Sequence, residues 1–174
     1  IQEKQMVTQK GANTYVVGIT GNFDDAQTAV KKMFNDHELA AELDQAGFQF
    51  SSANSINIGR LVPQIVYYVY AYASLVRDGR IKDGQEINVV VPTGNFGNIL
   101  AAYYAKNMGL PIKKLICASN DNKVLFDFFT TGTYDRNIEF ILTTSPSMDI
   151  LISSNLERLI YSCLLYTSDA ADEA

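Results

Sequence analysis

The chain has 174 residues, of which 47% are apolar and 19% are charged, and its formal net charge is −5. This composition supplies enough apolar side chains for a packed core and argues against a disordered chain. The acidic balance, with no cluster of lysine and arginine, makes nucleic acid a poor partner. The longest apolar candidate, residues 65–76, is rich in tyrosine and shorter than the roughly 18 residues of a membrane span.

The two ends of the chain indicate a piece of a longer reading frame. The chain begins at Ile1 without methionine, and residues 163–174 resemble the translation of a sequencing adapter. We therefore expect a truncated frame with a non-native tail at residues 163–174, and this tail is set aside in predicting the fold.

Cysteine and histidine usage points away from several kinds of site. Cys117 and Cys163 have neither disulfide nor zinc spacing, which fits a reducing, cytoplasmic setting without a metal site. The only histidine, His37, is expected on the surface. A chain with one histidine offers no Ser/His/Asp or Cys/His arrangement for nucleophilic catalysis.

The first part of the chain predicts a small α/β unit. In chain order, the patterns indicate a strand at residues 15–19, a helix at 26–34, a short helix at 38–44 and a strand at 48–50. Asp24 or Asp25 is expected to cap the first helix. The polar residues 51–55 predict a crossing between two domains near residue 54.

The second part predicts a parallel open sheet with flanking helices. The expected elements begin with a long helix at residues 58–77, a strand at 87–91, a helix at 98–108 and a strand at 114–118. A helix at 124–129, an irregular stretch at 138–142 and a helix at 148–161 follow. Pro63 falls in the first turn of the long helix, where it is tolerated, and the tyrosines of this helix are expected in the core. The strand–helix–strand run is a βαβ unit, so its strands should be parallel.

The turn inside this βαβ unit is the best candidate for a binding site. Thr93-Gly94-Asn95-Phe96-Gly97-Asn98 follows the carboxyl end of a parallel strand, where open α/β sheets bind ligands. Two glycines let the backbone approach a ligand closely, and unpaired amides at the helix start suit a phosphate. Asn98 is expected to cap the helix, while Thr93 and Asn95 add side-chain donors. The pattern lacks the lysine of a P-loop and the third glycine of a dinucleotide-binding loop. A tight turn that binds no ligand remains an alternative interpretation.

Residues 91–111, from Val-Pro-Thr-Gly-Asn-Phe-Gly-Asn to Gly-Leu-Pro, resemble the threonine synthase family. Residues 21–27, 54–60 and 118–122 support the resemblance, in family order. The resemblance implies an α/β fragment of a fold-type-II enzyme that uses pyridoxal 5′-phosphate (PLP), with parts of two domains. Residues 1–53 would be the remainder of the smaller middle domain and residues 54–162 part of the larger PLP-binding domain.

The resemblance also implies a reaction, in which O-phospho-L-homoserine and water give L-threonine and phosphate. It implies that the turn holds the coenzyme phosphate, chiefly through main-chain amides, at Thr93, Gly94, Asn95, Phe96, Gly97 and Asn98. Thr93 stands where the family often has serine, and Asn98 where many relatives have aspartate. Asn54, Asn57 and Arg60 are candidates for binding the substrate phosphate.

Two departures from the family pattern limit what this chain does alone. The family's Schiff-base lysine lies in an upstream Phe-Lys-Asp-like motif, and the partner of the pyridine nitrogen lies further toward the C-terminus. Lys82-Asp83 is expected to be a surface turn instead. No catalytic residue is therefore assigned, and the chain alone is expected to be inactive. Another fold-type-II PLP lyase, such as a threonine dehydratase or a cysteine synthase-like enzyme, and a noncatalytic phosphate- or nucleotide-binding module remain alternatives.

Overall fold

The chain forms two compact units, Ile1–Phe50 and Ser51–Ala174. The computed structural model describes Lys4 and residues 11–172, apart from the side chains of Phe23 and of residues 166–172. All residues of the expected binding turn lie in the second unit.

Helices α2 (Phe23–Phe34) and α3 (His37–Gln45) lie in the first unit. The cap of α2 is Asn22, not Asp24 or Asp25 as expected. The Asn22 side chain accepts from the Asp25 amide, and the Asp25 carboxylate accepts from the Asn22 amide at 2.9 Å. Asp25 is therefore the second half of a capping box. His37 is exposed at the start of α3, as expected.

Neither strand expected in the first unit is present among the described residues. Tyr15 and Val17 are 86% and 84% exposed, and Phe48 is 67% exposed. A β-branched run becomes a strand only when a neighbour satisfies its backbone N–H and C=O groups. The described part of this unit offers only an isolated bridge between Gly11 and Thr14. Phe50 instead packs its ring against Phe34, with a centroid separation of 5.4 Å.

The long helix expected at the start of the second unit is divided into three consecutive pieces. These are α4 (Ile58–Leu61), a 3₁₀ turn η1 (Val62–Gln64) and α5 (Ile65–Arg77). The break occurs at Pro63, which lacks the N–H that a continuous α-helix would use. Tyr72 is buried, but Tyr67 and Tyr70 are 60% and 67% exposed. The expectation that the tyrosines lie in the core is therefore wrong for these two residues.

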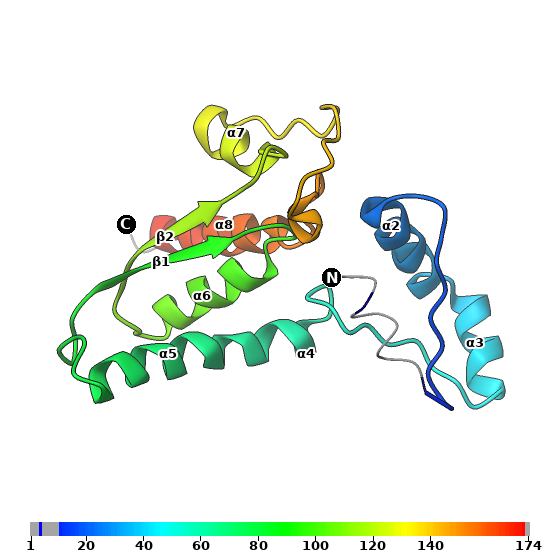
Figure 1. Cartoon of the computed structure of the whole chain (residues 1–174), viewed down its shortest axis with the longest axis horizontal. Helices are drawn as coiled ribbons and strands as arrows, with labels where there is room; N and C mark the ends of the chain where they lie inside the picture. The colour runs from blue at the N-terminus through cyan, green and yellow to red at the C-terminus, as the bar shows by residue number, and fades with distance from the viewer. Residues whose placement is uncertain (1–3, 5–10, 173–174) are drawn as a thin grey trace. The chain divides into compact units, whose positions relative to one another are not determined.

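The βαβ unit is confirmed. Strand β1 (Ile87–Pro92), helix α6 (Gly97–Asn107) and strand β2 (Ile112–Ala118) follow one another, and the strands pair in parallel with Val91 opposite Cys117. They form a two-stranded open sheet, and α6 packs against both strands and against α5 (Figure 1). The second unit is therefore α/β with helices flanking a parallel sheet.

The remaining elements cover the sheet at its carboxyl end and along α6. Helix α7 (Val124–Thr131) contacts β2, and α8 (Leu156–Asp172) contacts α6 (Figure 1). The helix expected from residue 148 begins only at Leu156, after a 3₁₀ turn η2 (Pro146–Met148), because the polar residues between them hydrogen-bond to other segments. Residues 163–172 of the expected tail continue α8, and residues 173–174 lie outside the described residues.

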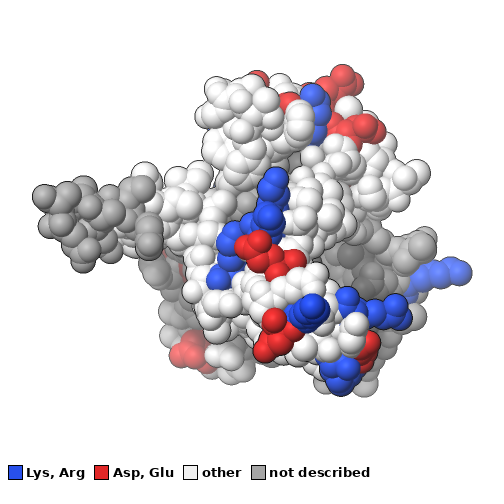
Figure 2. Space-filling model, turned by 90° about the vertical axis from the view of Figure 1, so that its left-hand side faces the viewer, with Lys and Arg blue, Asp and Glu red and all other residues white. Residues whose placement is uncertain are grey.

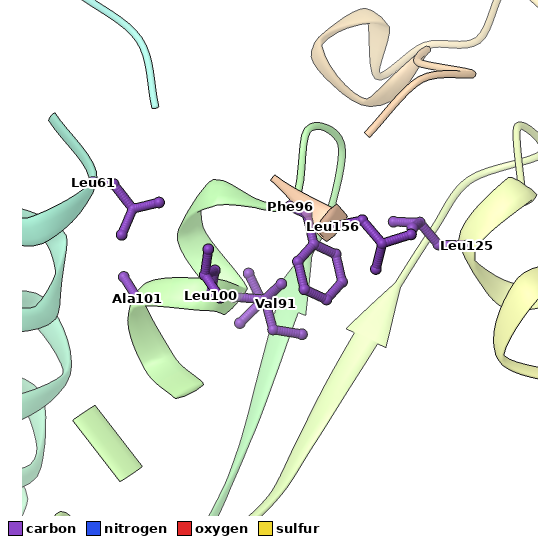
Figure 3. Packing of buried hydrophobic residues seen from close by; sticks show 8 residues of the cluster. Leu61, Val91, Phe96, Leu100, Ala101, Leu125 and Leu156 are labelled. Carbon is purple, nitrogen blue, oxygen red and sulfur yellow. The ribbon is translucent and has the colours of Figure 1, made fainter. Parts of the chain in front are cut away.

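The core of the second unit lies between the sheet, α6 and α8. Figure 3 shows its apolar side chains converging from α4, β1, α6, α7 and α8. Leu61 and Leu100 are fully buried, and Phe96, from the turn after β1, is 4% exposed. The turn is thus attached to the core through Phe96.

Charged side chains are spread over the surface. On the face in Figure 2, basic and acidic residues are intermixed. Lys82 and Asp83 are exposed, as expected of a surface turn.

No helix among residues 11–172 is long and apolar enough to cross a membrane. Among the side chains that the structure describes, no group of three or more His, Cys, Asp and Glu residues is arranged to hold a metal ion.

Candidate functional site

The candidate site is the turn that joins β1 to α6. Thr93 extends the sheet, because its N–H donates to the Ala118 carbonyl at 2.8 Å. Its hydroxyl donates to the Val91 carbonyl at 2.7 Å, and the residue is 5% exposed. The Thr93 hydroxyl proton is therefore committed to the protein, and Thr93 shapes the turn from inside.

The turn enters α6 through Phe96, which has a left-handed backbone (φ 68°). A bulky residue adopts this conformation only when its surroundings hold it there, and such residues cluster at functional sites. Here the Phe96 ring is buried in the core, and this packing maintains the left-handed backbone (Figure 3). Phe96 occupies the cap position, so the expectation that Asn98 caps the helix is wrong.

Several amides of the turn and of the first turn of α6 have no hydrogen-bond partner among the described residues. They include the N–H groups of Gly94, Asn95, Phe96 and Asn98. The Gly97 N–H donates to the Asn95 Oδ1 at 3.2 Å, within the turn. Free amides at the start of an eleven-residue helix, where the positive end of the helix dipole lies, have the donor arrangement and the electrostatic potential that suit an anion.

Both glycines of the turn face protein rather than open space. A Cβ on Gly97 would overlap the Oγ and Cβ of Ser55. A Cβ on Gly94 would lie 2.8 Å from Ile150 Cδ1 and 3.1 Å from the Ser147 carbonyl oxygen. The expectation that these glycines clear a path for a ligand is therefore wrong. They let the turn pack closely on two other segments.

A buried polar junction joins the turn to two distant segments. Ser55 Oγ accepts from Asn95 Nδ2 at 2.9 Å and from Asn155 Nδ2 at 3.0 Å. Arg158 donates to the carbonyls of Ser55 and Ile56 at 2.9 and 2.7 Å. Ser55 is 6% exposed and Asn155 fully buried. Sequence reasoning missed Asn155 and Arg158. Residues 153–155 are of types that cap helices and stand just before an apolar helical pattern, and this could have identified them as candidates.

A second polar cluster holds residues 143–149 at the carboxyl end of β2. Asp149, 4% exposed, accepts from Asn120 Nδ2 at 2.6 Å, from Asn122 Nδ2 at 3.1 Å, and from the Thr143 amide and hydroxyl at 2.9 and 2.7 Å. Burial alone would raise its pKa, but these hydrogen bonds outweigh burial and hold the pKa of Asp149 below its usual value. The segment on which Gly94 packs is thereby fixed.

The three candidates for a substrate phosphate lie on the segment that carries Ser55. Asn57 caps α4, because its Oδ1 accepts from the Gly59 amide and its Nδ2 donates to the Ser52 carbonyl. Asn54 uses its Oδ1 for the Ile56 amide at 2.9 Å, and Arg60 uses Nε for the Ala53 carbonyl at 2.9 Å. Within the described part of the chain, the Asn54 Nδ2 and the terminal nitrogens of Arg60 remain available as donors.

Asn98 is oriented by a tyrosine of α5. The Tyr68 hydroxyl donates to the Asn98 Oδ1 at 2.5 Å and lies 3.1 Å from the Asn98 carbonyl oxygen. Burial raises the pKa of Tyr68 to about 12, so the hydroxyl stays a donor at neutral pH. Because its oxygen faces Tyr68, the Asn98 carboxamide presents its NH₂ group elsewhere.

Removal of the Tyr68 hydroxyl provides a stability test. Tyr68→Phe is expected to lower the free energy of unfolding by about 1 kcal/mol, the usual worth of such a hydrogen bond. Denaturant unfolding measures the change. The matched control is Tyr67→Phe, because Tyr67 is 60% exposed and no hydrogen bond of its hydroxyl is seen in the described residues. Equal losses in both variants would contradict the assigned hydrogen bond.

Two residues of the turn, Phe96 and Asn98, each line a hollow of the second unit. Phe96 lines an apolar pocket of about 460 Å³ that also includes Tyr103 and Cys117. Asn98 lines a pocket of about 400 Å³ with Tyr68 and Val90. Burial raises the pKa of the Cys117 thiol, and a hydrogen bond with Thr93 acts in the opposite direction. The raised pKa keeps this thiol protonated at neutral pH.

No family model matches the chain. The chain is 52% identical to the human protein named threonine synthase-like 1 over 162 residues, which cover 92% of the chain and 22% of that protein. It is 44% identical to threonine synthase from Saccharomyces cerevisiae, over 92% of the chain and 30% of that enzyme.

The chain also matches solved structures of threonine synthases. The PLP-bound threonine synthase from Brucella melitensis matches with a TM-score of 0.72 and 45% identity, over 94% of this chain and 32% of that chain. Threonine synthase from Escherichia coli matches with a TM-score of 0.77 and 38% identity, over 94% of this chain and 36% of that chain. The chain thus spans between about a fifth and about a third of its relatives' length. Over nearly its whole described length, the chain is therefore similar to one segment of threonine synthases.

Proposed function

We propose that the chain is part of a threonine synthase, a carbon–oxygen lyase that uses PLP to convert O-phospho-L-homoserine and water to L-threonine and phosphate. The observation that carries the proposal is the row of free amides at Gly94, Asn95, Phe96 and Asn98, at the carboxyl end of a parallel strand. The family matches support it, and one matched structure is described as PLP-bound.

The turn fits the phosphate group of this coenzyme. Its donors are main-chain amides, its glycines face the protein interior, and the positive end of the α6 dipole favours a dianion. In the proposal, Gly94, Asn95, Phe96 and Asn98 hold the phosphate, while Thr93 and Gly97 shape the turn. The bound coenzyme supplies an electron sink for proton removal from the substrate carbons.

The proposal assigns the substrate phosphate to the segment around Ser55. Asn54 and Arg60 keep donors available, and a guanidinium pairs well with a phosphate. Asn57 contributes by capping the helix that presents Arg60. We further propose that residues 1–53 belong to the smaller middle domain and residues 54–162 to the PLP-binding domain. The protein would act in the cytoplasm on a small phosphorylated amino acid.

The experiment is an assay of the full-length protein that contains this segment. With PLP and O-phospho-L-homoserine, we expect threonine and inorganic phosphate in equal amounts, measured by amino-acid chromatography and phosphate release. The 174-residue chain, assayed in parallel, is expected to show no turnover.

Two further substrates separate the alternatives. Release of 2-oxobutyrate and ammonia from L-threonine would indicate a threonine dehydratase, and cysteine formation from O-acetylserine and sulfide would indicate a cysteine synthase. A folded, PLP-loaded protein that turns over none of the three would contradict the enzyme proposal and favour a noncatalytic module.

A further inference from the structure

Two buried polar residues just before α8 contact the backbone of the turn. Ser153 is 9% exposed and Asn155 is fully buried. The Ser153 hydroxyl donates to the Gly94 carbonyl at 2.6 Å. Asn155 donates twice to the Asn95 carbonyl, from its backbone N–H and from Nδ2, each at 3.0 Å. Two consecutive carbonyls of the turn are therefore held by residues that follow 59 and 60 positions later.

The direction of these carbonyls fixes the direction of the next amides. The described residues contain no cis peptide bond, and in a trans peptide the C=O and the following N–H point in opposite directions. Since the Gly94 carbonyl faces Ser153, the Asn95 N–H points away from Ser153. In the same way, the Phe96 N–H points away from Asn155. Both amides belong to the set that has no partner among the described residues.

We infer that Ser153 and Asn155 are positioning residues for the anion site. They hold the carbonyls of Gly94 and Asn95 inward, so that the N–H groups of Asn95 and Phe96 face the bound phosphate. A flipped peptide would instead present a carbonyl oxygen, whose partial negative charge repels an anion. The inference rests on the proposed function, because it takes the coenzyme phosphate as the anion.

Both positioning residues are themselves held in place. The Ser153 N–H donates to the Tyr134 hydroxyl at 2.9 Å. The Asn155 Oδ1 accepts from Arg158 Nη1 at 2.5 Å, and the Asn155 Nδ2 also donates to Ser55. The orientation of the turn amides is thus set before any ligand arrives. Preorganised donors of this kind bind charge without having to reorganise.

The test uses two ligands that differ only in the phosphate, PLP and pyridoxal. Each is titrated into the full-length apoprotein, and binding is followed by the absorbance change of the ligand. Ser153→Ala removes the donor to Gly94. We expect it to bind PLP about tenfold more weakly, equivalent to about 1.4 kcal/mol, with its pyridoxal affinity unchanged. Ser153→Thr, which keeps the hydroxyl, is expected to bind PLP like the unmodified protein.

A control and a second variant keep the result interpretable. Ser162→Ala is the matched control, because the Ser162 hydroxyl also donates to a backbone carbonyl, that of Arg158, at 2.9 Å. It is expected to leave both affinities unchanged. Asn155→Asp removes the Nδ2 donor and keeps an oxygen for Arg158. It is expected to weaken PLP binding and spare pyridoxal, so the test survives if Ser153→Ala does not fold.

Each contrary outcome has a distinct meaning. If the unmodified protein prefers PLP to pyridoxal and Ser153→Ala and Asn155→Asp keep that preference, the positioning inference is wrong and the proposed function stands. If the variants weaken both ligands equally and lower the denaturation midpoint of the apoprotein, the two residues are only structural. If the unmodified protein binds both ligands equally, the phosphate site itself is wrong, and the inference fails with it.

Discussion

Replacing Gly97 with alanine is expected to destabilise the protein by about 3 kcal/mol, although alanine is the better helix former. The added Cβ would overlap the Oγ and Cβ of Ser55. Moving Ser55 aside would break its hydrogen bonds with Asn95 and Asn155. Because Gly97 does not have a positive φ, the cost comes from lack of space alone. Denaturant unfolding of the full-length protein, followed by far-ultraviolet circular dichroism, measures it.

A second background identifies the cause of this loss. Ser55→Gly removes both overlapping atoms, so Gly97→Ala is expected to cost less than about 1 kcal/mol in that background. The matched control is Gly18→Ala, because a Cβ there meets nothing within 4 Å and Gly18 has no positive φ. It should change the free energy of unfolding by no more than about 0.5 kcal/mol. An equal cost of Gly97→Ala in both backgrounds would show that Ser55 is not the obstacle.

Removal of the Asp149 carboxylate is expected to cost about 3 kcal/mol or more in the Asp149→Ala variant. The substitution removes one acceptor each from the side chains of Asn120 and Asn122, and it removes the acceptor of the Thr143 amide, in a buried site. Asp149→Asn, which keeps one oxygen, should cost about 2 kcal/mol. The control is Asp83→Asn, because Asp83 is exposed. Denaturant midpoints at pH 7 give the comparison.

The same carboxylate makes stability depend on pH in a defined direction. Because the pKa of Asp149 in the folded protein lies below its usual value of 3.8, its contribution is complete above that value. The contribution is lost as pH falls through the lowered pKa. The stability difference between the unmodified protein and Asp149→Asn should therefore shrink as pH falls below about 4. A difference that stays constant from pH 7 to pH 3 would argue against an ionised Asp149.

Local sequence patterns predicted the parts of the fold that depend on local sequence. The βαβ unit was predicted because its strands are short apolar runs and its helix has clear ends, and the structure pairs Val91 with Cys117 as a parallel sheet requires. Strands at 15–19 and 48–50 were expected from the same kind of pattern and are absent from the described residues. A strand depends on a partner that its own sequence does not specify.

The candidate turn was predicted in position but not in detail. Glycine spacing indicated a close approach, yet sequence alone does not say whether ligand or protein approaches, and at Gly97 it is Ser55. The cap of α6 was assigned to Asn98 by residue type, but the buried ring of Phe96 holds a left-handed backbone there. Contacts between Ser55 and Asn155 join residues 100 positions apart, and no local pattern reports them.

This separation also determines when the turn can form during protein synthesis. Ser55 and Asn95 leave the ribosome well before Asn155 and Arg158, which complete their hydrogen bonds. Contacts between residues so far apart form only once the later segment is available. A nascent chain stalled before residue 153 already contains α5, β1 and α6, yet its turn amides lack the groups that aim them. If the turn binds the coenzyme phosphate as proposed, capture of that phosphate waits until α8 has begun to emerge.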